Sequence, residues 1–386
     1  MFDYFTHGLV TGLIVFQTVI LVVMLSNMTI LRLARRHAPP GEYPMVSVLV
    51  PARNEEKNIG RCISSLLAQD YPVFEVLVLD DQSSDDTNRI LEKTASNQSK
   101  LKVLTGSTPP AGQVGKNWAC MQLAQAAQGE LLFFTDADTF HQPQTLRLMV
   151  AALNGEQADL LTGFPRQEIQ SWGERLLVPF FTWAFLCFEP LWLAYRLRLA
   201  VLSNAVGQMM LFRKVAYRAI GGHGSVGSEI VDDIMLAGKI KSAGLRWRVV
   251  HVTDLISCRM YRGSREAFEG FSKNYFAAFG YRLLVYLFVF LWLGVTFWEP
   301  LIVLMLMILR LIPLVHLDLL AACIGLELLV WLIPYIEMGL PVGLGLIYPV
   351  TILANDVAAA NSLRLSLTGR LTWKGRPLAR PKWKWL

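Results

Sequence analysis

Long apolar segments near both ends of the chain constrain its fold more than any other feature. Residues 8–31 contain no charged side chain, and 24 such residues are long enough to span a bilayer. The chain is 53% hydrophobic and only 17% charged, whereas charged residues make up about 25% of an ordinary soluble domain. The sequence therefore predicts a protein that is embedded in a membrane.

Residues 8–31 are predicted to form an N-terminal transmembrane anchor. A secretory signal peptide is the alternative, but no basic region precedes the segment and no small-residue cleavage site follows it. Instead, three arginines come directly after it: Arg32, Arg35 and Arg36. Because basic flanks stay in the cytoplasm, we expect the amino terminus outside and the rest of the soluble chain in the cytoplasm.

A second apolar block, residues 283–357, is predicted to contain two to four spans. It consists of four apolar runs that charges or prolines interrupt: residues 283–297, 301–309, 319–336 and 340–354. Basic residues lie on both sides of the block, so we expect an even number of crossings. Four short spans and two long hairpin arms both satisfy that condition, and three spans do not.

The segment after this block, residues 361–386, is predicted to be a basic cytoplasmic tail. From residue 357 onward there are seven Lys or Arg and no acid. Trp373, Trp383 and Trp385 stand among these basic residues, which favours a tail at the level of the lipid headgroups. The five cysteines show no paired metal spacing, so we expect reduced and mostly buried thiols.

Between residues 44 and 260 the pattern changes to alternating strands and helices. Short apolar runs predict strands at residues 45–50, 76–79, 101–104 and 131–134, with helical segments between them. This alternation indicates an α/β fold with a doubly wound parallel sheet. In open sheets of this kind, ligands gather at the carboxyl ends of the strands.

Two carboxylates follow the last of these strands, in the segment GELLFFTDADTF at residues 129–140. Residues two apart in an extended chain point to the same side, so Asp136 and Asp138 can converge. Because like charges repel, a divalent cation with an attached phosphate is the expected occupant. Taken alone, the motif also fits a turn or a helix start.

Polar segments follow three strands at the same edge of the predicted sheet: PARNEE (51–56), DDQSSDDT (80–87) and DAD (136–138). None of these three strand ends carries G-x-G-x-x-G or G-x-x-x-x-G-K-[ST], which disfavours a dinucleotide-binding dehydrogenase or a P-loop enzyme. Carboxylates in place of glycines predict that acceptor groups bind the base and ribose of a nucleotide, and that a metal binds its diphosphate.

Four ordered motifs resemble family 2 inverting glycosyltransferases of the GT-A fold: VSVLVPARNEE, VLVLDDQSSDDT, DAD and IVDDIMLAGKIKSAG. The resemblance covers roughly residues 44–260 and implies a Rossmann-like nucleotide-diphospho-sugar transferase domain. GKNWAC, GQMMLFRK, GGH and GFSKN are similar to segments of bacterial membrane enzymes that glycosylate lipids. Carotenoid glycosyltransferases of the diaponeurosporenoate type are the most similar, with hopanoid-associated and ceramide glucosyltransferases as more distant relatives.

The resemblance implies a role for each matching donor-side residue. The nucleotide pocket would contain Pro51, Arg53 and Glu55, with Asp80 or Asp81 on the uracil and Lys116 on the diphosphate. Asp136 would approach the ribose or the metal, and Asp138 would ligate Mg²⁺ or Mn²⁺. A lysine suits a diphosphate because its ammonium is a mobile point charge.

The resemblance also implies the residues that act on the acceptor. Asp233 matches the general base, and Asp232 stands where the family often has Glu, which keeps the charge but shortens the side chain. A pair of carboxylates at a helix start is the structural alternative for both. Gln208 and His223 are candidate acceptor contacts, and a structural loop role is the alternative for His223.

Residues 176–194 are apolar enough to mimic another span, yet they lie between the metal motif and the general base. One crossing there would place the two on opposite sides of the membrane. Pro179 and Pro190 also interrupt a smooth helix. We therefore expect broken interfacial helices within residues 171–200, and a buried core segment is the alternative.

The sequence and its resemblance together predict an inverting, metal-dependent hexosyltransferase in a bacterial cell membrane. It would transfer a sugar, with glucose as the first candidate, from a UDP-sugar to a lipid such as a carotenoid acid. The expected partners are the donor, the lipid acceptor and the membrane, with no nucleic acid. A processive polysaccharide synthase and a non-catalytic sugar-nucleotide-binding scaffold are the alternatives. The absence of a Q-x-x-R-W element disfavours the synthase.

Overall fold

A seven-stranded mixed sheet forms the centre of the computed structural model, which describes residues 2–34, 36–38, 40–313, 316–373 and 376–386. Arg35 and Lys374, part of the basic flanks noted above, lie outside the described residues. The strand order is β3-β2-β1-β4-β8-β6-β9. The strands are β1 (Val46–Ala52), β2 (Phe74–Asp80), β3 (Leu101–Thr105), β4 (Leu131–Phe134), β6 (Leu160–Phe164), β8 (Met210–Arg213) and β9 (Trp247–His251).

The direction of β8 corrects the prediction of a parallel sheet. The first four strands are parallel, as expected, but β8 pairs antiparallel with both β4 and β6. The chain leaves β6 at the carboxyl edge of the sheet, forms helices there and returns from the same edge. Because it never crosses back to the opposite edge, β8 must run against its neighbours.

Helices cover the sheet, and the first three of them lie between the predicted strands. They are α2 (Ile59–Leu67), α3 (Thr87–Ala95), α4 (Gly115–Ala126), α5 (Thr145–Gly155), α8 (Lys214–Ala219) and α9 (Asp232–Ser242). In α2, Ile59, Cys62, Ile63 and Leu66 are buried, which is the i, i+3, i+4, i+7 face. All five cysteines are free and buried, as expected.

A small sheet and two short 3₁₀ helices complete the αβ part. The small sheet has the order β5-β10-β7 and consists of β5 (Thr139–His141), β7 (Arg166–Gln167) and β10 (Ile256–Cys258). The 3₁₀ helices are η1 (Ala200–Leu202) and η2 (Gly222–Val226). β5 begins directly after the DAD motif, so this sheet fixes the chain on the far side of the two carboxylates.

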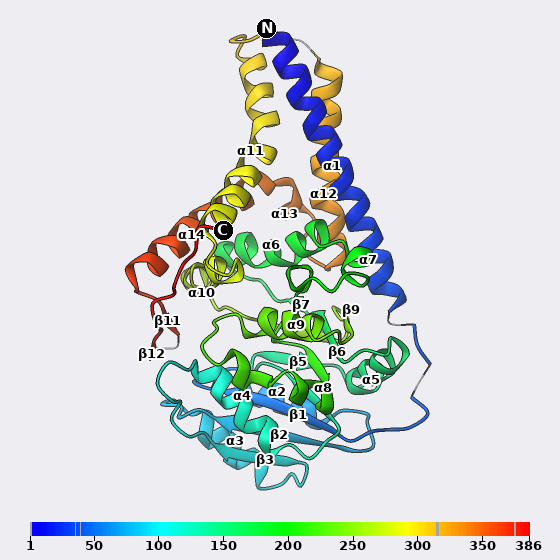
Figure 1. Ribbon diagram of the computed structural model, residues 1–386, viewed down its shortest axis with the longest axis vertical. Coiled ribbons are helices and arrows are strands. Elements are labelled where there is room, and N and C mark those ends of the chain that lie inside the picture. The colour runs from blue at the N-terminus through cyan, green and yellow to red at the C-terminus, as the bar shows by residue number, and fades with distance from the viewer. Residues whose placement is uncertain (1, 35, 39, 314–315, 374–375) are drawn as a thin grey trace.

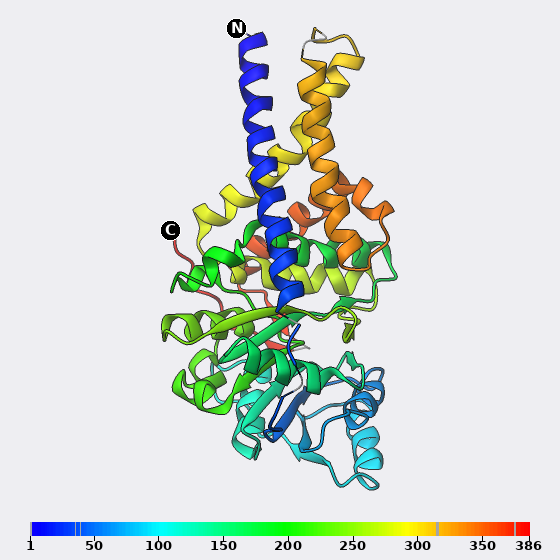
Figure 2. The same ribbon diagram turned by 90° about the vertical axis from the view of Figure 1, so that its right-hand side faces the viewer.

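Within the described residues, three helices are long and apolar enough to cross a membrane, and Figures 1 and 2 show them extending together away from the sheets. They are α1 (Phe2–Leu33), α11 (Leu283–Ile308) and α12 (Leu317–Glu337). α11 merges two of the four predicted apolar runs and α12 corresponds to a third, so the C-terminal block forms two long arms. The remaining run belongs to α13 (Gly343–Leu346) and the start of α14 (Tyr348–Thr368), and neither meets the same criterion of length and composition. The number of crossings stays a prediction.

A layer of helices separates the sheets from the apolar helices (Figure 1). It contains α6 (Trp172–Phe188), α7 (Leu191–Ala194), α10 (Ser264–Ala278) and α14. The predicted break in the 171–200 segment is present between α6 and α7. Asn27 of α1 fills it, since its side chain donates to the carbonyls of Leu186 and Glu189 and accepts from the amide of Leu191.

Most side chains of α6 are buried in protein, as the core-segment alternative requires. Trp183 stacks on Trp331 of α12 with ring centroids 4.0 Å apart. The helix nevertheless lies across the base of the apolar helices (Figure 1). Its position at a membrane interface therefore stays a prediction.

The tail after α14 folds back against the αβ part. A two-stranded hairpin, β11 (Thr372–Trp373) and β12 (Arg376–Pro377), lies beside the sheet domain (Figure 1). The last residues return to the base of α11, where Lys384 and Leu283 are joined by a backbone hydrogen bond of 2.8 Å.

Candidate active site

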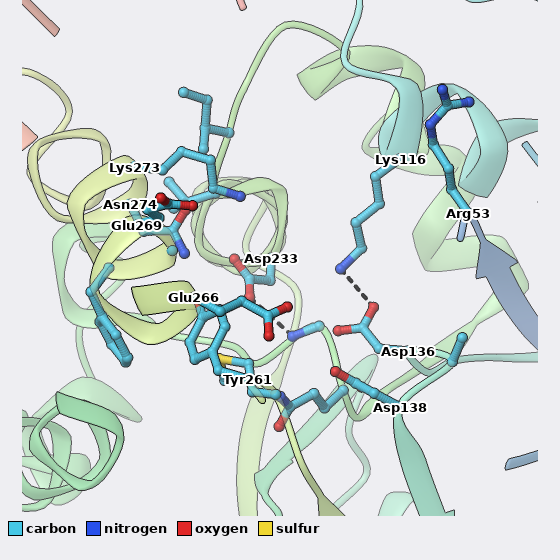
Figure 3. A pocket seen from close by; sticks show the side chains of 18 of the residues that line it. Arg53, Lys116, Asp136, Asp138, Asp233, Tyr261, Glu266, Glu269, Lys273 and Asn274 are labelled. Atoms are coloured by element: carbon cyan, nitrogen blue, oxygen red, sulfur yellow. Dashed lines mark hydrogen bonds and ion pairs between the residues drawn. The ribbon is translucent and has the colours of Figure 1, made fainter. Parts of the chain in front are cut away.

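A cavity of about 1000 Å³ lies at the carboxyl edge of β1 and β4, below α6 and α10. It brings together most residues that the sequence singled out: Pro51, Arg53, Glu55, Asp81, Lys116, Asp136, Asp138, Gln208, Asp232 and Asp233. Asp80 and His223 are not part of its lining. Figure 3 shows several of these side chains pointing toward one another.

Lys116 and Asp136 form an ion pair across the cavity, with 2.7 Å between Nζ and Oδ1 (Figure 3). Lys116 is the second residue of α4, where the helix dipole disfavours a cation and favours an anion. Burial also disfavours the ammonium, but Asp136 and Asp232 outweigh it and raise the pKa of Lys116 well above its usual value. The cation is therefore permanent and faces open space where an anionic ligand fits.

Asp138 has the chemistry of a metal ligand. Its Oδ1 atom is buried and has no hydrogen-bond partner among the described residues. Burial, together with the charges of Asp136 and Glu55, raises the pKa of Asp138 to about 7. Within the described part of the chain, no group of three or more His, Cys, Asp or Glu side chains could hold a metal alone. Two carboxylates suit Mg²⁺ or Mn²⁺ when substrate phosphates and waters complete the shell.

Asp233 is held at the start of α9 by two backbone amides. Its Oδ2 accepts a hydrogen bond from the Gly207 amide and its Oδ1 one from the Ile234 amide, both at 2.9 Å. Burial raises the pKa of Asp233 to about 6, with a further contribution from the negative charge of Asp232. The carboxylate is thus ionised at neutral pH and still a competent proton acceptor.

Asp232 is not equivalent to Asp233, because its carboxylate lies beside His223. Its Oδ2 lies 3.3 Å from Nε2 of His223, which is fully buried and hydrogen-bonds to Tyr217 over 2.8 Å. Burial opposes ionisation of Asp232, but Lys116 and His223 outweigh it and keep its pKa below the usual value. His223 therefore stabilises the charged form of Asp232 without lining the cavity, in line with the structural alternative for this histidine.

Two further predicted residues differ in how directly they face the cavity. Gln208 lines it, although its Oε1 accepts a hydrogen bond from Gln167 over 3.0 Å. Asp80 is turned away, because its Oδ1 accepts hydrogen bonds from the backbone and side chain of Ser83. Of the two candidate uracil ligands, only Asp81 reaches the cavity.

Comparison with known proteins agrees with this geometry. Residues 47–221 match the sequence model described as glycosyl transferase family 2. This match identifies a family 2 glycosyltransferase domain within residues 47–221. The relatives of this domain include a β-monoglucosyldiacylglycerol synthase of Trichormus variabilis, 42% identical over 100 residues that cover 25% of this chain and 21% of the relative. A 4,4'-diaponeurosporenoate glycosyltransferase of Staphylococcus aureus is 28% identical over 236 residues, 60% of this chain and 61% of the relative.

Both alignments span less than two thirds of the relative's own length. Among solved structures, a mannosyltransferase from Pyrobaculum calidifontis in complex with GDP-Man and Mn²⁺ has a TM-score of 0.52 at 18% identity. The match covers 92% of this chain and 99% of that one. It confirms the predicted GT-A fold.

Helix α10 contributes a polar face to the cavity that was not predicted from the sequence. Glu266, Glu269, Lys273 and Asn274 of this helix line the cavity beside Asp233 (Figure 3). No hydrogen bond or ion pair joins Lys273 to another residue that the structure describes. Burial and the nearby Lys116 lower the pKa of Lys273 to about 8. The GFSKN motif and the i, i+3, i+7 spacing were the available signals, but Lys273 was interpreted only as a charge flanking the membrane block.

The wall of the cavity that faces the apolar helices is largely hydrophobic. It is formed by Phe164 at the end of β6, Val178 and Phe181 of α6, and Phe271 and Tyr275 of α10. These residues are buried or half-buried in the layer below the apolar helices. The family 2 domain therefore combines a charged donor-like side with an apolar side in one cavity.

Proposed function

We propose that this chain transfers a hexosyl unit from a UDP-sugar to the hydroxyl or carboxylate of a membrane lipid, with inversion at the anomeric carbon. Glucose is the first candidate for the sugar. The family 2 domain supports a transferase, and the named relatives act on diaponeurosporenoate or make glucosyldiacylglycerol, which are lipid-type molecules.

One observation carries this proposal: a permanent cation and a proton acceptor converge on one small residue. A Cβ atom added to Gly207 would lie 3.0 Å from Nζ of Lys116, 3.6 Å from Asp136 Oδ2 and 3.7 Å from Asp233 Oδ2. The glycine leaves an open space that both groups face. A leaving diphosphate and an attacking oxygen need those two groups on opposite sides of the anomeric carbon.

The proposed reaction uses residues that are already in place. The acceptor oxygen forms the new bond to the anomeric carbon while Asp233 takes its proton, a contribution worth about 10²–10⁴-fold in rate. The bond to the diphosphate breaks on the opposite face, and Lys116 stabilises the charge that develops there. A divalent cation held by Asp138 and Asp136 would supply further positive charge to the diphosphate.

The apolar wall supports a lipid acceptor. Phe181 and Val178 of α6 line the same cavity as Asp233, and α6 packs against α1 and α12. An acceptor with a hydrocarbon body can bury it against this wall while its polar end reaches Asp233. Burial of apolar surface contributes about 25 cal/mol per Å², which favours a lipid over a water-soluble sugar.

The test is transfer of radiolabelled glucose from UDP-glucose by the detergent-purified full chain, with Mn²⁺ or Mg²⁺ and a bacterial lipid extract. We expect the label in the organic phase, and its loss in Asp138→Ala and Asp233→Asn. Label in an aqueous polymer would contradict lipid transfer and support a polysaccharide synthase. UDP binding without transfer from any UDP-sugar would support a non-catalytic scaffold.

A further inference from the structure

The C-terminal tail contributes to the wall of the cavity on its nucleotide side. Leu371, Thr372 and Leu378 line the cavity, although they lie at least 290 positions after Asp81 in the chain. The hairpin of β11 and β12 carries these residues from the end of α14 to the carboxyl edge of the sheet (Figure 1). A tail that had been expected at the lipid headgroups thus reaches the donor side of the family 2 domain.

Arg376 of this hairpin forms a bidentate contact with Asp81. Its NH1 atom donates to Asp81 Oδ2 over 2.7 Å, and NH2 lies 3.4 Å from Oδ1. NH2 also donates to the side-chain oxygen of Gln82 over 3.1 Å. The Asp81 side chain is only 4% exposed, so this guanidinium provides most of its compensating charge. Arg53 approaches from the other side at 3.9 Å.

We propose that Arg376 is a positioning residue of the donor site, which holds the ionised Asp81 in the orientation that reads the base of the nucleotide. This inference rests on the proposed UDP-sugar donor. The tail residues beside Arg376 that line the cavity would form a wall at its nucleotide end and leave room for the ligand.

The hydrogen-bonding pattern of the bases explains what such positioning achieves. An ionised carboxylate only accepts hydrogen bonds, and each of its oxygens has two lone pairs. Asp81 can therefore keep its contacts with Arg376 and still accept the N3–H group of uracil. Cytosine has an acceptor at N3, so the same carboxylate repels it. Selection of uracil over cytosine then depends on Asp81 being charged and fixed.

The surroundings of Asp81 make that charge depend on Arg376. Burial raises the pKa of Asp81, while Arg376 and then Arg53 oppose this shift and the adjacent Asp80 adds to it. Loss of Arg376 shifts the balance toward the neutral acid, and a neutral carboxyl group can donate to cytosine N3 as well as accept from uracil. Loss of Arg376 should thus weaken uracil binding and the discrimination between the two bases.

The experiment measures dissociation constants of UDP and CDP by calorimetry with the purified full chain. We expect Arg376→Ala to weaken UDP binding about 10-fold and CDP binding much less, so that the UDP/CDP preference falls. Arg376→Lys should restore part of the preference, because a lysine keeps the positive charge. Arg380→Ala is the matched control, since Arg380 is an exposed arginine of the same tail, and it should behave as wild type.

A kinetic split separates positioning from a general structural effect. Arg376→Ala should raise the KM for the donor and leave both the kcat and the KM for the acceptor within about twofold. Unchanged or tighter UDP binding in Arg376→Ala would overturn the inference, and so would equal losses for UDP and CDP. A wild-type chain that binds no uridine nucleotide would instead contradict the proposed donor, so the two failures are distinguishable.

Discussion

Gly207 and Asp233 are joined by a hydrogen bond of 2.9 Å from the glycine amide to the carboxylate, and the same glycine faces Lys116. Any side chain at position 207 would enter the space between the proposed base and the proposed diphosphate ligand. The lack of a side chain at Gly207 therefore sets how closely the proposed base, Asp233, and the proposed diphosphate ligand, Lys116, approach each other.

Gly207→Ala is expected to lower kcat/KM for transfer by roughly 10-fold, which is less than the about 10²-fold that misplacing a reacting group by about 1 Å can cost. The added methyl group would stand 3.0 Å from Nζ of Lys116 and force that ammonium to shift. Steady-state transfer rates measure the effect. Gly41→Ala is the control, because a Cβ atom there meets nothing within 4 Å. Wild-type kinetics in Gly207→Ala would show that the convergence is not used.

The pH dependence of kcat/KM should report the ionisation of Asp233. Its raised pKa of about 6 predicts an acidic limb that ends near pH 7 and a tenfold loss per pH unit well below 6, because only the ionised form accepts a proton. Asp232→Asn removes a charge that raises this pKa, so the midpoint should move to lower pH. An unchanged midpoint in that variant would contradict the assignment of the acidic limb of the pH profile to Asp233.

Lys273 is expected to bind the donor diphosphate from the α10 side of the cavity. A hydrogen bond to a charged group contributes about 1.5–3 kcal/mol, so Lys273→Gln should raise the donor KM roughly 10–100-fold. Because the pKa of Lys273 is lowered to about 8, wild-type kcat/KM should fall above that pH, and the variant should lose this limb. Lys93→Gln, an exposed lysine on α3, is the control. A variant with the wild-type donor KM would remove Lys273 from the site.

Metal removal should abolish transfer, and Mn²⁺ or Mg²⁺ should restore it. Asp138→Ala should raise the metal concentration for half-maximal rate at least as much as the roughly 10–100-fold typical of losing an outer-shell partner. The buried, unpartnered Oδ1 of Asp138 is the reason for this expectation. Glu92→Gln, on the exposed side of α3, is the control. Full activity in EDTA would contradict the metal role of the DAD motif.

The parts of the fold and site that local patterns encode could be predicted from the sequence. The apolar run 131–134 is β4 with every residue buried, and Asp136 and Asp138 follow it into the cavity, although Asp138 lies in a turn and not in an extended segment. The break at Pro190 was equally local, since proline removes a backbone donor and cannot continue the helix. The partner that fills this break, Asn27, lies 162 residues before Glu189 and left no local signal.

The remaining features depend on contacts between distant segments. Periodicity says nothing of strand direction, so the prediction of a parallel sheet did not foresee β8, which returns from α6 and α7 antiparallel to its neighbours. Arg376 looked like one charge of a basic tail, because its contact with Asp81 joins residues 295 positions apart. Lys273 was similarly interpreted as a charge that flanks the membrane block, because the sequence does not show which segments pack around its face of α10.

The most direct test of the proposed mechanism is the single-turnover transfer rate of Asp233→Asn, in a folded chain that binds UDP as wild type does. Asparagine keeps the size of the side chain and can still accept a hydrogen bond from the Gly207 amide, but it cannot take a proton. We predict a rate lower by about 10²–10⁴-fold, the usual contribution of general-base catalysis. A wild-type rate in this variant would show that Asp233 is not the base.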